Sequence, residues 1–205
     1  MLRENNVRAG FLEHEHYQAM LKHLPACMRP VVTFAYVTGW RINSEVLPME
    51  WRQVDLKAGE VRLDPGTTKN LEGRVFYLTP ELKKLLAEQR KAANRLQRQK
   101  GMIVQHVFFH DGVTQAGDVA FLAGNRIAPS GFYHAWCRAR IDAGRPGSIP
   151  HDLRRTAVRN MVRAGIPERV AMKLSGHKTR SVFDRYNIVS DGDLREASQH
   201  LSRLR

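Results

Sequence analysis

The sequence predicts an α+β fold that is mostly helical, with one small antiparallel β-sheet. Apolar residues recur with the helical period along most of the chain, and glycine or proline ends each run. Over 60–78 the pattern changes to two short clusters of β-forming residues around a polar connection. With 42% hydrophobic residues in a chain of 205, a sizeable core can be buried.

Two helices with apolar faces are expected ahead of the sheet. They cover 13–25 and 29–38, are separated by a proline, and the second ends at Gly39. A further helical turn or two is expected over 42–48, where another proline closes it. The chain therefore enters the β-region from a short, tightly turned segment.

The sheet is predicted from "EVRLD" (60–64) and "GRVFYL" (73–78), joined by the polar stretch "PGTTKNLE". Pro80 then begins a strongly charged helix that runs to about Gln99. The inner side of this helix carries Leu82, Leu85, Leu86 and Ala93.

The second half of the chain returns to helices after a loop-rich segment. Residues 100–128 hold one short apolar stretch, "HVFFH", and are the obvious place for an insertion. Helices are predicted near 130–143, 151–164, 167–175 and 191–204, with Gly144, Gly165 and Gly176 as stop signals. No repeat or domain boundary is visible, so we expect a single domain over 1–205 with a tail helix within 187–205.

Charge narrows the class of function. The chain has 33 Lys and Arg against 20 Asp and Glu, a formal net charge of +13, which favours a polyanionic partner such as nucleic acid. A merely soluble basic surface is the plain alternative. No run reaches the roughly 18 apolar residues of a spanning helix, and the start lacks the apolar region of a secretion signal. Cys27 and Cys137 are solitary, as expected of reduced thiols in a cytoplasmic protein.

The segment "HDLRRTAVRNMVRAG" suggests an anion site. His151 and Arg154 are three residues apart, so on a helix they share one face, which we expect to point outward at the start of the helix. Leu153 and Ala157 lie on the opposite, buried side. Helix N-termini attract phosphate, but a solvated basic face would give the same pattern.

Two further cations are candidates for binding an anion. Arg41 in "TGWRINSEVL" follows a glycine at the opening of a helix and has Glu45 one turn on. A carboxylate can hold the guanidinium so that its fork meets a phosphate, or the two can form an ordinary surface ion pair. Lys69 lies in the hairpin connection "TTKN", where it either reaches a ligand or keeps the loop solvated.

No cofactor is expected. The segment "HEHYQ" lacks the spacing of a zinc-binding HExxH helix, and no GxxxxGK[ST] phosphate loop occurs. The two cysteines have no nearby partners for a metal site. We therefore predict neither a metal nor a nucleotide.

Four blocks together identify a family. "TGWR…EVL", "TKN", "HDLRR" and "LSGHKTRSVFDRY" occur in the order found in the tyrosine site-specific recombinases, also called phage-type integrases. The chain resembles this family from about residue 8 to residue 200. His177 stands nine residues before Tyr186, and this spacing within the ordered set is specific to the family. The resemblance implies the fold of a tyrosine recombinase catalytic domain.

The resemblance also implies a role for each matched residue. Tyr186 would attack a DNA phosphodiester to give a 3′-phosphotyrosine and a free 5′-hydroxyl. The scissile phosphate would be bound by Arg41, Arg154 and His177. Lys69 would protonate the departing 5′-oxygen, and His151 would assist proton transfer at the tyrosine. The bond energy would be kept in the tyrosyl ester, so that neither ATP nor a metal would be needed.

The remaining implications concern partners. Double-stranded DNA would be the substrate, and the full recombinase would self-associate as a tetramer on paired sites, in a bacterial cell or phage-infected host. We expect the usual N-terminal core-binding and arm-binding domains of the family to be absent from this chain. The tail helix would dock on a neighbouring protomer or on its own domain. Flanking DNA phosphates would be neutralised by Arg155, Arg159, Lys173, Lys178, Arg180 and Arg185.

The chain departs from the family pattern in two places. The acidic residue usually comes three positions after the first arginine, whereas Glu45 comes four after Arg41, so either Glu45 or Ser44 orients that arginine. Arg155 stands where histidine often follows the second arginine. Two alternative functions remain open: a type IB topoisomerase-like enzyme, and a truncated, non-catalytic DNA-binding remnant or regulator.

Overall fold

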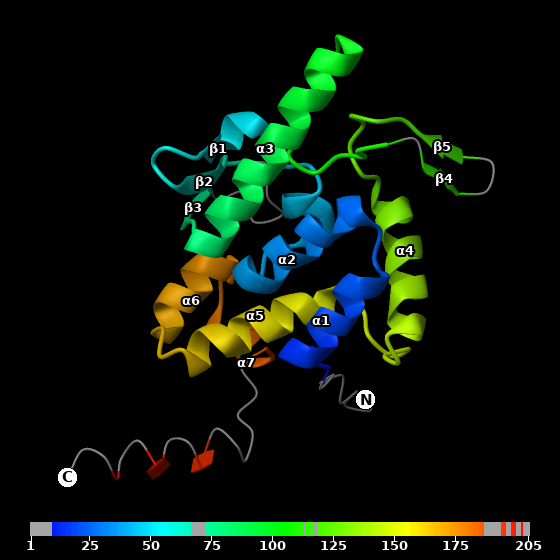
Figure 1. Cartoon of the computed structure of the whole chain (residues 1–205). Helices are drawn as coiled ribbons and strands as arrows, with labels where there is room; N and C mark the ends of the chain where they lie inside the picture. The colour runs from blue at the N-terminus through cyan, green and yellow to red at the C-terminus, as the bar shows by residue number, and fades with distance from the viewer. Residues whose placement is uncertain are drawn as a thin grey trace.

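Helix α2 (Arg29–Thr38) lies at the centre of the molecule in the computed structural model (Figure 1). Val31, Val32, Phe34 and Ala35 are fully buried. A helix that is apolar on nearly all sides belongs in a core, and α5 (His151–Arg163) packs along it. The structure describes residues 10–66, 73–112, 114–116, 119–186, 194–195, 198–199 and 202.

The remaining helices surround this central pair. Helix α1 packs on α4, and α6 packs on both α5 and the strand β3 (Figure 1). Short 3₁₀ turns cover Ala26–Met28 and Trp51–Gln53. The helices are α1 (His14–His23), α3 (Pro80–Lys100), α4 (Pro129–Asp142), α6 (Glu168–Ser175) and α7 (Arg180–Asp184). The predicted helices of the described segments are confirmed to within a few residues, and α7 is a helix that the sequence did not indicate.

The predicted sheet is present and has three antiparallel strands in the order β1-β2-β3. They are β1 (Val54–Asp55), β2 (Glu60–Leu63) and β3 (Arg74–Tyr77). Val61 pairs with both Val54 and Phe76, so the apolar side of the sheet faces the core. The hairpin connection that holds Lys69 lies outside the described residues.

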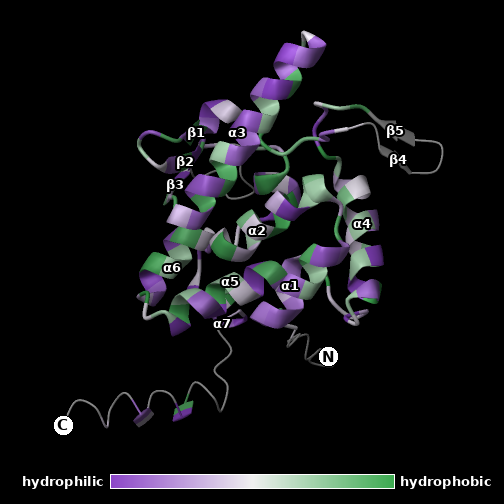
Figure 2. Cartoon of the chain, viewed as in Figure 1, coloured by the Kyte–Doolittle hydropathy of each residue, from purple (hydrophilic) through white to green (hydrophobic). Residues whose placement is uncertain are grey.

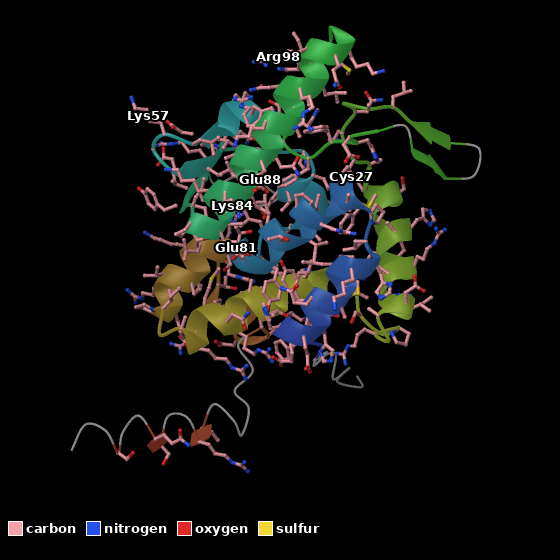
Figure 3. All side chains as sticks on the ribbon, in the orientation of Figure 1. Cys27, Lys57, Glu81, Lys84, Glu88 and Arg98 are labelled. Atoms are coloured by element: carbon pink, nitrogen blue, oxygen red, sulfur yellow. The ribbon has the colours of Figure 1, made fainter. Side chains whose placement is uncertain are left out.

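Helix α3 begins and ends as its sequence predicts. The Thr79 hydroxyl accepts a hydrogen bond from the backbone N–H of Leu82, and Gly101 ends the helix at φ 64°. Its last turns extend beyond the rest of the molecule and are mostly hydrophilic (Figures 1 and 2). In Figure 3 the labelled side chains of Glu81, Lys84, Glu88 and Arg98 follow the exposed side of α3.

The loop-rich segment 100–128 contains a hairpin that the sequence did not indicate. It consists of β4 (Thr114–Ala116) and β5 (Val119–Phe121), which pair antiparallel away from the main sheet (Figure 1). Strands of three residues are too short to show alternation. Most of the tail helix predicted over 191–204 lies outside the described residues. In the described part of the chain, no helix combines the length and apolar character needed to span a bilayer.

Candidate active site

Arg154 is the most enclosed of the predicted site residues. Its side chain projects from α5, and its Nη1 donates to the backbone carbonyls of Gly39 at 2.6 Å and Ser175 at 2.5 Å. These carbonyls close α2 and α6, where the helix dipole attracts a cation. The expectation that Arg154 points outward is therefore wrong, because the residue is 2% exposed. It reaches the surface only through the cavity described below.

His177 lies against Arg154. Gly176 ends α6 in the left-handed conformation, at φ 74°, and thereby turns the chain so that His177 faces inward. Since the Ser175 hydroxyl donates to the carbonyl of Ala171, it accepts from His177 Nδ1, at 2.7 Å. Nε2 then faces the Nη2 of Arg154 at 3.1 Å as an acceptor. Burial and the Arg154 charge lower the pKa of His177 to about 3, so the ring is neutral at pH 7.

Tyr186 contacts the site residues from a position 35 residues after His151 in the sequence. Helix α7 precedes it, and the backbone N–H of Tyr186 donates to the carbonyl of Phe183. Its hydroxyl lies 2.7 Å from His151 Nε2, and its ring centroid is 4.7 Å from that of His177. Burial, followed by the charges of nearby arginines, lowers the pKa of His151 to about 4. A neutral His151 can accept the proton of the Tyr186 hydroxyl.

Arg41 enters the site from a π-helical turn, Ile42–Val46. The backbone N–H of Val46 donates to the carbonyl of Arg41, which widens the turn by one residue relative to an α-helix. Glu45 thus reaches back to Arg41, accepting from its backbone N–H at 2.7 Å and from Nη1 at 2.8 Å. The wider turn accommodates the extra residue between arginine and acid, and Glu45 rather than Ser44 bonds the arginine.

An open cavity of about 710 Å³ brings these groups to one surface. Arg41, His151 and Arg154 line it on one side, and Ser130 and Tyr133 at the start of α4 line the other. Two guanidiniums and His151, whose Nε2 contacts the Tyr186 hydroxyl, therefore border one space. Such a set can bind an anionic ester and deprotonate a nucleophile beside it.

The six predicted DNA-contacting residues differ in their exposure and in their contacts. Arg155 is half-buried, with its guanidinium carbon 5.8 Å from the Tyr186 ring centroid. Arg180 is exposed but pairs with Glu168 and, more distantly, Asp184. The other exposed cations are Lys173, Lys178 and Arg185.

Arg159 does not fit the prediction that it binds DNA. It is 6% exposed, its Nη2 lies 2.7 Å from a carboxylate oxygen of Glu13, and its guanidinium covers the Phe11 ring at 4.1 Å. The helical period places this residue on the side of α5 that holds the N-terminal segment. Its burial and its contacts with Glu13 and Phe11 therefore argue for a structural role and against a contact with phosphate.

Sequence reasoning missed Arg74 and Ser175. Arg74 lies 2.5 Å from Glu45 Oε1, and its guanidinium carbon is 5.0 Å from the Trp40 ring centroid. A charged residue at the first position of a strand is usually at the surface, so nothing marked it. Ser175 orients His177, and its position two residues earlier was the only available signal.

No metal centre is formed by the part of the chain that the structure describes. Within it, no group of three or more His, Cys, Asp or Glu side chains is arranged to hold a metal ion. Cys27 and Cys137 are free thiols, and burial raises the pKa of Cys27 to about 11. The Cys27 thiol is therefore not activated as a nucleophile.

Comparison with known proteins places this site in a family. The model of the "Phage integrase family" matches residues 10–192. The integrase of Salmonella phage P22 is 24% identical over 199 residues, covering 97% of this chain and 49% of that protein. The chain thus spans about half the length of this relative.

Two solved structures show the same fold. XerA recombinase superimposes with a TM-score of 0.70 at 19% identity, over 93% of this chain and 63% of that chain. A lambda integrase dimer bound to a COC′ core site gives a TM-score of 0.64 at 17% identity, over 87% of this chain and 48% of that chain. Identities this low establish the arrangement of helices and strands, and the chemistry has to be argued from the site itself.

Proposed function

The chain belongs to the phage integrase family, and on that premise we propose that it cleaves and rejoins DNA strands through a covalent bond to Tyr186. The observation that carries the proposal is the 2.7 Å contact between the Tyr186 hydroxyl and His151 Nε2, beside a cavity lined by Arg41 and Arg154. A nucleophile, its base and two phosphate-binding guanidiniums then act on one phosphate group of the DNA.

The cleavage step begins at the tyrosine. The Tyr186 oxygen attacks the phosphorus of a DNA phosphodiester as its proton passes to His151 Nε2, which is free to accept it because the ring is neutral. The P–O5′ bond breaks as the new P–O bond to tyrosine forms. The departing 5′-oxygen takes a proton from a general acid, a role we assign to Lys69 on the family motif alone. Rejoining is the reverse of these transfers.

The arginines act on the transition state. The pentacoordinate phosphorus carries more negative charge on its non-bridging oxygens than the diester does, so fixed cations favour it over the substrate. Arg154 is held by two backbone carbonyls and Arg41 by Glu45, so neither has to be ordered during the reaction. His177 joins them once a bound phosphate raises its pKa, because the protonated ring can donate from Nε2.

The wider proposal is site-specific recombination, with double-stranded DNA as substrate and a tetramer of the whole protein on paired sites. It rests on the family and on a DNA-bound lambda integrase dimer. The exposed cations Lys173, Lys178 and Arg185 would contact flanking phosphates. A type IB topoisomerase-like activity and DNA binding without cleavage are outcomes that the test separates.

The test is a cleavage assay on nicked DNA that carries a candidate attachment site. The nick lets the short 5′-hydroxyl fragment diffuse away, which traps the covalent complex. We expect an adduct that survives a chelator, is lost in Tyr186→Phe, and persists in the matched control Tyr77→Phe, whose ring is 72% exposed on β3. DNA binding without an adduct would favour a binder, and relaxation of supercoiled DNA by the monomer would favour a topoisomerase.

A further inference from the structure

Arg74 occupies a buried position at the start of β3, where its side chain is 11% exposed. It shares one face of the strand with Phe76, and both side chains contact Trp40. Any side chain on Gly176 would overlap the Nη1 of Arg74, so this guanidinium also packs against the turn that presents His177. Three segments far apart in the sequence therefore meet at Arg74.

Glu45 lies between two guanidiniums. Its Oε1 is 2.8 Å from the Nη1 of Arg41 and 2.5 Å from the Nη2 of Arg74. The carboxylate has no exposed surface, whereas 26% of the Arg41 side chain is exposed and lines the cavity. The buried acid thus holds one arginine that faces the cavity and one that does not.

The charges of these three groups decide how strongly Arg41 attracts an anion. Arg41 and Glu45 alone form a neutral pair, and a carboxylate at 2.8 Å cancels much of the field of the guanidinium toward a phosphate. With Arg74 included, two cations and one anion sum to one positive charge. Because Glu45 and Arg74 are buried, water and salt screen this difference of one charge less than they would at the surface.

We propose that Arg74 is a positioning residue, one that balances the charge of Glu45 so that Glu45 can orient Arg41 without cancelling its attraction for phosphate. This inference rests on the function proposed above. It assigns Arg74 no contact with the substrate. The role differs from packing alone because it depends on the charge of Glu45.

The test therefore changes both charges. Arg74→Met removes the cation and keeps a long apolar side chain, and Glu45→Gln removes the anion and keeps an acceptor for Arg41. The two single variants and the double variant complete a cycle. Arg62→Met on β2 is the matched control, since the Arg62 side chain is 65% exposed and pairs with Glu60. The readouts are single-turnover cleavage at saturating DNA and the Kd of the DNA.

We expect Arg74→Met to lower the cleavage rate about tenfold or more, less than the loss of a direct oxyanion donor. Adding Glu45→Gln should restore most of that loss, while the DNA Kd changes by less than about threefold because many other phosphates contribute. An unchanged rate in Arg74→Met would overturn the proposal. So would a loss that Glu45→Gln fails to relieve, since that result describes packing.

If the wild type forms no adduct, that result counts against the proposed function and does not test the role of Arg74. A second measurement then tests the role of Arg74 directly. Inorganic sulfate is titrated against the guanidinium NMR signal of Arg41 in each variant. We expect sulfate to bind at least about fivefold more weakly in Arg74→Met and to recover with Glu45→Gln, as one charge near the anion is lost and regained. Equal affinities would refute the inference. If Arg74→Met does not fold, Arg74→Lys replaces it and should keep the wild-type affinity.

Discussion

The Nε2 of His151 and the hydroxyl of Tyr186 lie 2.7 Å apart although 35 residues separate them in the sequence. His151 begins α5, and Tyr186 follows α7, so the contact depends on how the last helices fold back onto α5. The exposed phenol of an isolated tyrosine has a pKa near 10 and attacks poorly at neutral pH. In the function proposed above, this contact supplies the base that such a nucleophile needs.

Removing this base should slow cleavage without weakening DNA binding. For His151→Ala we expect the single-turnover rate on nicked DNA to fall about 10²–10⁴-fold, the usual contribution of general acid–base catalysis. The control is His23→Ala, which removes an exposed histidine from α1. A rate within threefold of wild type would show that the phenol loses its proton to another group.

The pKa of His151 should respond to Arg155. Burial is the main cause of its low value, about 4, and the charges of Arg154 and Arg155 lower it further. In Arg155→Met one cation is gone, so the pKa of His151 rises and a larger fraction of the ring is protonated at pH 5. NMR titration of His151 measures the shift directly. Cleavage by the variant should then decline at a higher pH than wild-type cleavage, since a protonated ring accepts no proton.

His177 should make the fold sensitive to acid. Burial, followed by Arg154, lowers its pKa to about 3 from an ordinary 6.5, so between these values the unfolded chain takes a proton that the folded chain refuses. The free energy of unfolding therefore falls as pH drops from about 6.5 toward 3, by a few kcal/mol for a group this buried, and is flat above that range. Urea denaturation at pH 7, 5 and 4 should show a smaller decline in His177→Asn. Parallel curves would assign the acid sensitivity to other groups.

Glu45 should be worth far more to stability than a surface acid. In Glu45→Ala two neighbouring guanidiniums lose their shared counter-charge, and breaking a buried pair costs about 3–5 kcal/mol. Asp64→Ala is the comparison, because the Asp64 side chain is 42% exposed and pairs with the exposed Arg52, and such a surface pair contributes at most about 1 kcal/mol. Urea denaturation of both variants measures the difference. Equal losses would contradict the central place of Glu45 in the site.

Two cations of the last third of the chain should behave in opposite ways. Arg159→Ala removes a buried partner of Glu13 and Phe11, so the free energy of unfolding should fall by about 1–3 kcal/mol with the salt dependence of DNA binding unchanged. Lys173→Ala removes an exposed charge, so stability should hold while the slope of log K against log salt decreases by about one. The reverse pattern would restore Arg159 to the DNA contacts.

Most of the helices and the strands β2 and β3 could be predicted because their signals are local, whereas β1 and α7 were not indicated. The bounds of α3 follow from Pro80 and Gly101, and the strands follow from short runs of β-forming residues. The ordered motifs indicated which side chains would meet. The local pattern did not indicate their depth: Arg154 is a buried residue because two distant carbonyls accept its hydrogen bonds, and Arg159 is buried because the N-terminal segment folds over it.

The π-helical turn is a second feature that the local sequence pattern did not indicate. The spacing of residues along an α-helix did not decide whether Glu45 or Ser44 orients Arg41, because the segment is in fact a π-helical turn. The widened turn changes which residue faces back by one position. The buried position of Arg74 could not be predicted from residue spacing. Its partners are Glu45, 29 residues earlier, and Gly176, about a hundred residues later in the sequence.

The anchoring of Arg154 to the ends of α2 and α6 has a consequence for when the site forms during folding. Here the guanidinium is fixed only when both helix ends have come together around α5. A partly folded chain lacks the fixed cation, so the cleavage step proposed above depends on completion of the fold.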